Sequence, residues 1–195
     1  MTEATFYYDF SSPYSYFTAH RLAAGFPAAV RWQPILFGGL IGAIGKTPWS
    51  VQKGREAGMR ECERRAAALG LPLVWPHEWP LGTYSVAIVR AALAADEQGL
   101  IREFSLAAFR HGLGLGRDLR DFDVVVEAAR EAGTDVGALV ATAERDETKR
   151  LVRTVTDAAV ADGVTGIPTI DVAGQRFWGD DRFDEAVAAA SSAAG

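Results

Sequence analysis

The chain opens on a pattern of apolar and polar residues that changes from strand to helix and back to strand. Thr5–Asp9 is a short run of strand-forming aromatic residues that stops at the turn-prone cluster Ser11–Pro13. Over residues 13–25, apolar side chains recur at helical spacing until Gly25 ends the helix. Val30–Gln33 alternates again, as a second strand does. We therefore predict a β-α-β unit with parallel strands and a right-handed crossover.

The C-terminal part of the chain returns to a strand pattern. Thr169–Val172, a turn at Ala173–Gly174, and then Gln175–Trp178 are typical of a β-hairpin. After Gly179, apolar residues recur at helical spacing from Phe183 onward. The pattern predicts two further strands and a final helix.

Between these two ends lies a long segment with a different pattern. We expect residues 38–46, which are rich in glycine, to be flexible, whereas residues 50–161 are helical in pattern almost throughout. The order is thus β-α-β, helical insertion, β-β-α, which predicts an α/β fold. Residues 1–37 and 162–195 would form the core, and residues 38–161 an inserted helical domain between the second and third core strands.

Composition and charge narrow the kind of protein. Hydrophobic residues make up 49% of the chain and charged residues 23%, which is typical of a globular protein. The formal net charge is −5 and no block is rich in lysine or arginine, so we expect no nucleic-acid partner. Because no basic cluster opens the chain and no apolar run approaches the length of a bilayer span, we expect no membrane contact and a cytoplasmic protein.

Cysteine and histidine offer no pattern for a disulfide or a metal. Cys62 is the only cysteine, which excludes an intramolecular disulfide and a zinc site built from several cysteines. Its helical context lacks an obvious charge-stabilising base, which favours a structural thiol. His20, His77 and His111 are scattered without a carboxylate at ligand spacing, so we expect no metal site.

Two short motifs carry the candidate chemistry. Ser12–Ser15 stands where the first strand gives way to the first helix, and Ser12 by itself would be interpreted as a helix N-cap. Gly163–Thr169 places Ile167 and Pro168 directly before a strand. A proline at such a position favours a rigid turn with a cis peptide bond.

Together these motifs resemble a known family. Ser12–Ser15 resembles the Cys-x-x-Cys pair of thioredoxin-like proteins with both sulfurs replaced by oxygen, and the pair faces a cis-proline in those proteins. Phe6–Tyr16 is similar to the opening of 2-hydroxychromene-2-carboxylate isomerases and kappa-class glutathione transferases, a DsbA-like branch of the thioredoxin superfamily. Gly166–Thr169 and Phe177–Arg182 resemble the cis-proline turn and the Gly-x-Asp-Arg glutathione site of that family. The resemblance spans essentially the whole chain and implies a thioredoxin-like core of four strands, with the active site where core and insertion meet.

The replacement of sulfur by oxygen changes the expected chemistry. A hydroxyl cannot form a disulfide, so we expect no dithiol exchange within this chain. The N-terminus of the first helix still carries partial positive charge and unpaired N–H groups that favour a thiolate. The resemblance implies that Ser12 stabilises the thiolate of a bound glutathione, or of another low-molecular-weight thiol, through a charge-assisted hydrogen bond.

The same resemblance implies the rest of the cofactor site. The backbone of Ile167, before Pro168, would pair with the cysteinyl part of glutathione as a neighbouring strand does. Asp180 and Asp181, with the start of the last helix, would hold its γ-glutamyl end, and Arg182 would assist or orient Asp181. Without the other motifs, the two aspartates would be interpreted as a helix cap.

The expected substrate site is less defined. The loop Gly45–Trp49 lacks the asparagine that family members often carry, and the helix that follows lacks their tyrosine, so the organic substrate stays open. Lys46 would meet an anionic substrate carboxylate. Aromatic residues near this loop belong either to the core or to the wall of a pocket for a planar ligand: Trp49, Trp75, Trp79 and Tyr84.

The family implies a glutathione-dependent cis–trans isomerase of 2-hydroxychromene-2-carboxylate-like intermediates of aromatic degradation. Its partner would be a small aromatic or conjugated substrate, and family members are commonly homodimers. Two alternatives remain open. One is a kappa-class-like glutathione transferase, in which the thiol stays attached to the product, and the other is a catalytically silent thioredoxin-fold protein that binds thiols or peptides.

Overall fold

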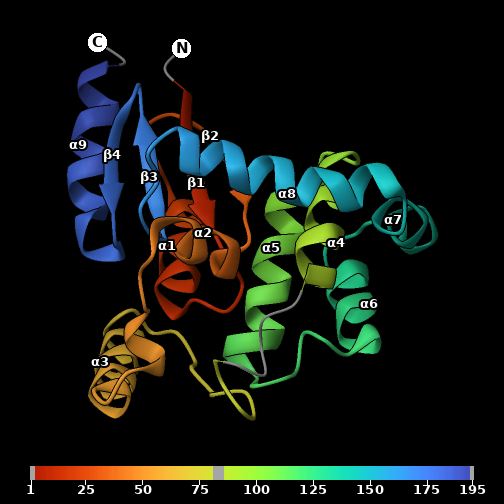
Figure 1. Cartoon of the computed structure of the whole chain (residues 1–195), viewed down its shortest axis with the longest axis horizontal. Coiled ribbons are helices and arrows are strands. Elements are labelled where there is room, and N and C mark those ends of the chain that lie inside the picture. The colour runs from red at the N-terminus through yellow and green to blue at the C-terminus, as the bar shows by residue number, and fades with distance from the viewer. Residues whose placement is uncertain (1–2, 81–85, 194–195) are drawn as a thin grey trace.

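The four strands form one mixed sheet in the computed structural model, which describes residues 3–80 and 86–193 (Figure 1). Strand β1 (Glu3–Tyr8) lies inside the sheet and pairs in parallel with β2 (Ala29–Pro34). On its other side β1 pairs antiparallel with β3 (Thr169–Val172), which pairs with the edge strand β4 (Gln175–Trp178). The parallel β1–β2 pair confirms the predicted β-α-β opening.

Local sequence signals end the elements of this core where expected. Helix α1 (Pro13–Ala24) begins after the N-cap Ser12 and ends at Gly25, whose φ of 155° suits glycine. In the hairpin between β3 and β4, Ala173 and Gly174 have φ values of 50° and 88°, the left-handed conformations that a tight two-residue turn requires. The predicted hairpin is confirmed with its bounds.

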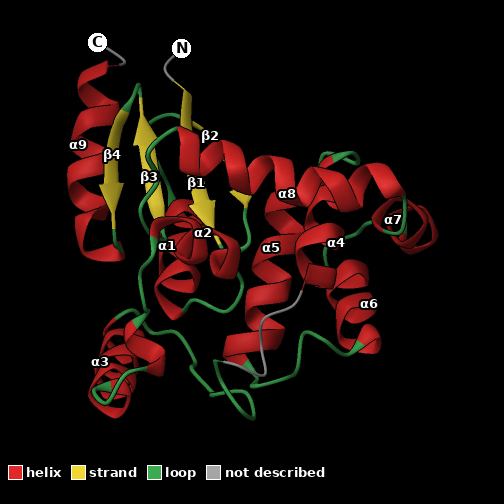
Figure 2. Cartoon of the chain, in the orientation of Figure 1, coloured by secondary structure: helices red, strands yellow, loops and turns green. Residues whose placement is uncertain are grey.

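The segment between β2 and β3 is mainly helical, which confirms the predicted insertion (Figure 2). Its α-helices are α2 (Phe37–Ile44), α3 (Arg55–Ala68), α4 (Val86–Asp96), α5 (Ile101–Phe109), α6 (Phe122–Glu131), α7 (Val136–Ala143) and α8 (Asp146–Ala161). Shorter turns are η1 (Trp49–Val51) and the π-type η3 (Arg110–Gly114), and η4 (Asp180–Arg182) precedes the last helix, α9 (Phe183–Ala193). Figure 1 shows α8 running from the α4–α7 group back to the sheet.

The prediction of a flexible stretch over residues 38–46 was wrong, because most of it is helix α2. The backbone N–H of Phe37 donates to the carboxylate of Asp9 at 2.8 Å, which satisfies one of the unpaired donors at the helix start. Leu40 is fully buried, and Gly45 ends the helix with a φ of 66°. A carboxylate from the turn that follows β1 and one buried side chain thus outweigh the poor helix propensity of three glycines.

Sheet and insertion share one hydrophobic core. The fully buried rings of Phe6 and Tyr8 on β1 stack at 4.8 Å, and Tyr8 contacts Phe109 of α5 at 5.9 Å between ring centroids. The Tyr8 hydroxyl also hydrogen-bonds the Ser105 hydroxyl of α5 at 2.6 Å. This packing places the end of β1 and the start of α1 against the insertion. Within residues 3–80 and 86–193, none of the helices combines the length and the apolar character that a bilayer crossing requires.

Candidate functional site

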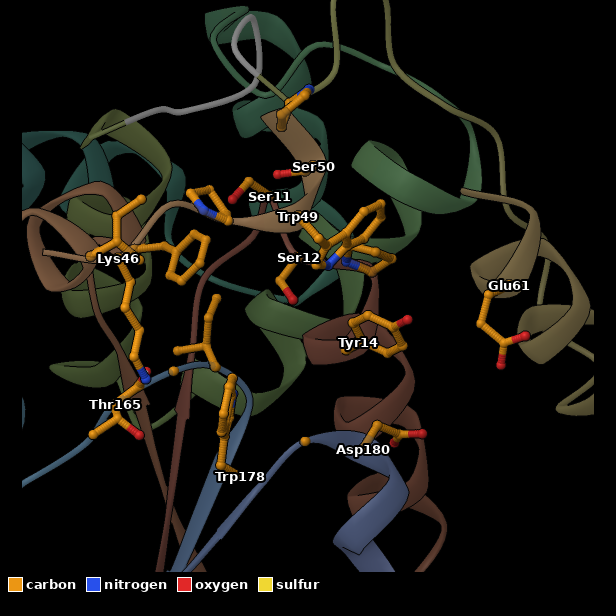
Figure 3. Close-up of a pocket in the computed structure, with 18 of the residues that line it drawn as sticks. Ser11, Ser12, Tyr14, Lys46, Trp49, Ser50, Glu61, Thr165, Trp178 and Asp180 are labelled. Atoms are coloured by element: carbon orange, nitrogen blue, oxygen red, sulfur yellow. The ribbon is translucent and has the colours of Figure 1, made fainter. Parts of the chain in front are cut away.

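A cavity of about 720 Å³ opens where the end of β1 and the start of α1 face the inserted segment. Its lining brings together seven residues that the sequence singled out: Ser12, Lys46, Trp49, Trp79, Ile167, Asp180 and Asp181. Figure 3 shows Ser12 near the middle of this group, with Lys46, Thr165 and Trp178 on one side and Tyr14 and Glu61 on the other. Pro168 and Arg182 adjoin lining residues without lining the cavity themselves, and Tyr84 lies outside the described residues.

Ser12 caps helix α1 and also borders the cavity. Its Oγ accepts a hydrogen bond from the backbone N–H of Ser15 at 3.1 Å. Because the oxygen acts as an acceptor there, the hydroxyl proton remains available to an anion in the cavity. The two interpretations of Ser12, helix cap and anion ligand, are therefore compatible.

The turn before Ser12 is organised by Asp9, which is only 6% exposed. The Asp9 carboxylate accepts hydrogen bonds from the Ser11 backbone N–H at 2.8 Å and from the Ser11 hydroxyl at 2.6 Å. Burial raises the pKa of Asp9, and the hydrogen bonds from Phe37 and Ser11 oppose that shift. In the sequence, Asp9 stands out only as the end of a predicted strand, although aspartate often accepts a hydrogen bond from the backbone N–H two residues later and so forms a turn.

The cis peptide bond predicted at Ile167-Pro168 is present. The carbonyl of Pro168 accepts a hydrogen bond from Gly179 N–H at 2.9 Å. Within the described part of the chain, neither backbone polar group of Ile167 has a hydrogen-bond partner. Ile167 thus presents a free donor and a free acceptor beside the cavity, which is what a peptide-like ligand needs for strand-like pairing.

The two neighbouring aspartates are in different situations. Asp180 is 1% exposed, and its carboxylate accepts hydrogen bonds from Thr18 Oγ1 at 2.8 Å and from Arg65 Nε at 2.5 Å. Arg21 adds a hydrogen bond to the Asp180 carbonyl at 2.7 Å. Asp181, by contrast, is exposed and has no hydrogen bond or ion pair among the described residues. Asp181 is therefore the aspartate whose side chain is open to a ligand.

Arg65 joins α3 to the core through its bond to Asp180. No signal in the sequence indicated this role, since nothing distinguishes Arg65 from the other charged residues of its helix.

Arg182 does not pair with Asp181 through its side chain. It pairs with Glu185 at 2.7 Å, and its guanidinium lies 5.2 Å from the centroid of the Phe177 ring. Its predicted support of Asp181 finds no direct hydrogen bond or ion pair in this arrangement.

Lys46 and Trp178 form one rim of the cavity. Lys46 Nζ lies 3.5 Å from the carbonyl oxygen of Thr165 and 5.0 Å from the centroid of the Trp178 ring (Figure 3). Trp178 itself is 51% exposed. A carbonyl at this distance is a weak partner for an ammonium group, so the Lys46 charge remains available to an anionic ligand.

Two of the predicted aromatic residues line the cavity. The ring of Trp79 lies 5.5 Å from that of Trp49 and 4.4 Å from that of Trp75, measured between centroids. Trp49 and Trp79 border the cavity, whereas Trp75 contacts Trp79 without lining the cavity. The cluster is thus both core and cavity wall.

Cys62 is fully buried on α3. Burial raises the pKa of its thiol to about 11, although a hydrogen bond with the hydroxyl of Tyr14 acts in the opposite direction. A thiol with so little thiolate near neutral pH is unreactive, which supports a structural role.

Comparison with known proteins extends over nearly the whole chain. A family profile described as the DSBA-like thioredoxin domain matches residues 4–190. A protein of Sphingobium xenophagum named 2-hydroxychromene-2-carboxylate isomerase is 30% identical over 92% of this chain and 93% of its own length. A protein of the same name from Pseudomonas putida is 24% identical over 91% and 89%.

Solved structures are similar in fold. A structure of 2-hydroxychromene-2-carboxylate isomerase superposes with a TM-score of 0.87 at 22% identity, covering 98% of this chain and 96% of that one. The cytosolic disulfide reductase DsbM from Pseudomonas aeruginosa with GSH gives a TM-score of 0.66 at 18% identity, covering 98% and 97%.

Proposed function

The chain belongs to the DSBA-like thioredoxin domain family and, within it, to the 2-hydroxychromene-2-carboxylate isomerase family, and from this membership we propose a glutathione-dependent isomerase. Its substrates would be 2-hydroxychromene-2-carboxylate-like intermediates of aromatic degradation. The observation that carries the proposal is the position of Ser12. It caps α1 and shares one cavity with Ile167, which precedes the cis-proline.

The residues around the cavity suit a peptide-like thiol. The free backbone groups of Ile167 can pair with its peptide portion, and the open carboxylate of Asp181 can hold an ammonium group. The hydroxyl of Ser12 and the N-terminus of α1 favour an anion at the sulfur position. These groups fit glutathione, and they also fit another low-molecular-weight thiol with an amino-acid end.

When bound, the thiol would supply the nucleophile that makes a conjugated double bond temporarily single, so that rotation about it becomes possible. The chain's own residues would prepare and confine this reaction. Ser12 would donate a hydrogen bond to the thiolate, and each pKa unit of preference for the charged form corresponds to about 1.4 kcal/mol. Lys46 would pair with the substrate carboxylate, while Trp49 and Trp79 would cover the planar part of the substrate.

The proposal also excludes intramolecular dithiol chemistry for this chain. Ser12 and Ser15 have hydroxyl groups where the redox pair of thioredoxin-like proteins has thiols, and Cys62 is buried with a raised pKa. A serine oxygen can bind a thiolate but cannot store two electrons as a disulfide. The sulfur that reacts would have to come from the bound thiol.

The direct test is to follow 2-hydroxychromene-2-carboxylate spectroscopically with the purified protein, with and without glutathione. We expect isomerisation that depends on the thiol and leaves the concentration of free thiol unchanged. Consumption of one thiol per product would contradict the isomerase and identify a transferase. Absence of turnover, together with an unshifted thiol pKa in the bound glutathione, would identify a binding protein. Repeating the assay with other low-molecular-weight thiols at equal concentration would rank them by kcat/KM.

A further inference from the structure

The residue before Ser12 is held by side chains from two different parts of the chain. Its backbone N–H and its hydroxyl both donate to Asp9, at 2.8 and 2.6 Å. Its carbonyl accepts a hydrogen bond from the indole Nε1 of Trp79 at 2.8 Å. Every polar group of Ser11 therefore has a buried partner. The peptide that joins Ser11 to Ser12 is held at both its polar groups, because the Ser12 N–H also donates to the Asp9 carbonyl at 3.2 Å.

Trp79 itself is fixed from the insertion. It is 3% exposed, and its ring packs between those of Trp49 and Trp75. The guanidinium of Arg55 lies 5.6 Å from the centroid of the Trp79 ring and donates a hydrogen bond to the Trp79 carbonyl. The two rings and the guanidinium that contact the indole of Trp79 thus come from the inserted segment.

Trp79 also lines the cavity, together with Ser11 and Ser12. One side chain therefore contacts both the aromatic end of the cavity and the turn that presents the Ser12 hydroxyl. Since the hydrogen bond and the ring contacts belong to one rigid indole, a shift of the ring would move the Ser11 carbonyl as well.

We propose that Trp79 is a positioning residue that sets the direction of the Ser12 hydroxyl and couples it to the aromatic wall of the cavity. This inference rests on the proposed function, in which Ser12 binds a thiolate. Trp79 does not need to touch the sulfur. Its indole N–H, together with the Asp9 carbonyl that accepts from the Ser12 N–H, keeps the Ser11–Ser12 peptide in the orientation from which the Ser12 hydroxyl points into the cavity.

The variant Trp79→Phe retains an aromatic ring and removes the donor to Ser11. The matched control is Trp75→Phe, which makes the same chemical change in the same cluster. The indole of Trp75 donates instead to the exposed Glu63 at 2.7 Å, and Trp75 does not line the cavity. Any difference between the two variants therefore reports on the contact with Ser11 and on the cavity wall.

The measurement is the thiolate absorbance of bound glutathione against pH. In Trp79→Phe the pKa of the bound thiol should rise by about 0.5 to 1 unit, the size of one net hydrogen bond, whereas Trp75→Phe should stay within about 0.2 unit of wild type. The same variant should lower kcat more than it raises KM for the thiol. Equal pKa values in wild type and in both variants would overturn the inference.

A second replacement guards against a folding defect. Trp79→benzothienylalanine, introduced by amber suppression, keeps the two fused rings and exchanges the N–H for sulfur, so it removes only the donor. It should reproduce the pKa rise of Trp79→Phe, and a wild-type value would contradict the inference. If wild type itself leaves the thiol pKa of bound glutathione at its free value, the proposed function fails together with the inference. If wild type lowers that pKa and both Trp79 replacements retain the lowered value, the inference alone fails.

Discussion

The two walls of the cavity are built from different kinds of groups. The core wall offers the hydroxyl of Ser12 and two groups that have no hydrogen-bond partner within residues 3–80 and 86–193, the backbone of Ile167 and the carboxylate of Asp181. The inserted wall offers the rings of Trp49 and Trp79. Polar groups with unused hydrogen bonds suit a peptide-like thiol, whereas apolar rings suit a planar substrate. In the proposed reaction, the groups that would bind the thiol and those that would cover the substrate therefore come from separate parts of the chain.

The walls also differ in how they are held. The core wall depends on local features, namely a helix cap and a cis-proline turn. The inserted wall depends on contacts between distant residues, such as the buried hydrogen bond from Trp79 to Ser11 and the ion pair of Arg65 with the buried Asp180. Substitutions should therefore separate effects on the thiol from effects on the assembly of the cavity.

The largest effect should follow Ser12→Ala. Removing one donor to a developing or full negative charge typically lowers the rate by about 100- to 1000-fold, and kcat/KM of the isomerisation should fall by that amount. In a separate measurement of stability, loss of the helix cap should lower the free energy of unfolding by ~1 kcal/mol. Ser15→Ala is the matched control, since the buried Ser15 hydroxyl has no hydrogen-bond partner among the described residues and its removal should leave both quantities near wild type. Full activity in Ser12→Ala would contradict the proposed hydrogen bond from Ser12 to the thiolate.

The next effect concerns the link between the walls. Asp180→Asn leaves the guanidinium groups of Arg65 and Arg21 without their buried carboxylate, and the free energy of unfolding in urea should fall by about 3 kcal/mol. Asp184→Asn is the control, because Asp184 also pairs with Arg21 but is exposed, and it should cost less than about 0.5 kcal/mol. Equal losses in the two variants would contradict a buried link.

A third prediction concerns the buried thiol of Cys62 on helix α3. Burial raises the pKa of Cys62 from its ordinary value of 9.0 to about 11, so the thiolate fraction below pH 9 should be about 100-fold lower than in the unfolded chain. Alkylation by iodoacetamide at pH 8 should be slower in the folded protein by at least that factor. Because the folded pKa is the higher one, this thiol's contribution to stability is complete below about pH 9 and is lost as the pH rises through about 11. Equal alkylation rates with and without denaturant would refute this account.

The smallest effect should come from the exposed rim. Lys46→Met removes the charge beside Trp178, and KM for a carboxylate substrate should rise by about 5-fold, since an exposed ion pair contributes up to ~1 kcal/mol. KM for the thiol should stay unchanged, which distinguishes the two walls. Lys53→Met provides the control, because Lys53 is exposed and does not line the cavity. A change in KM for the thiol, with KM for the carboxylate substrate unchanged, would contradict the pairing of Lys46 with the substrate.

Much of the core followed from short-range signals. The hairpin of β3 and β4 was predicted with its bounds, because its strands alternate and its turn residues tolerate a positive φ. The N-cap Ser12 and the cis bond at Pro168 were predicted for the same reason, since each depends on a few adjacent residues. Such signals can be read from the sequence without the tertiary structure.

The contacts that build the inserted wall could not be predicted from the sequence alone. Helix α2 forms where glycines predicted a flexible stretch, because Phe37 finds its acceptor on Asp9 at the end of another element. Arg65 reaches Asp180 from 115 residues away, and Trp79 reaches Ser11 from 68 residues away. Local propensity and motif spacing describe neighbours along the chain, whereas a buried hydrogen bond is decided by which distant partner shares its low-dielectric surroundings. The amino-acid order therefore predicted Ser12, Ile167 and Asp181 on one side of the cavity, and packing alone decided which side chains close the other side and contact the turn before Ser12.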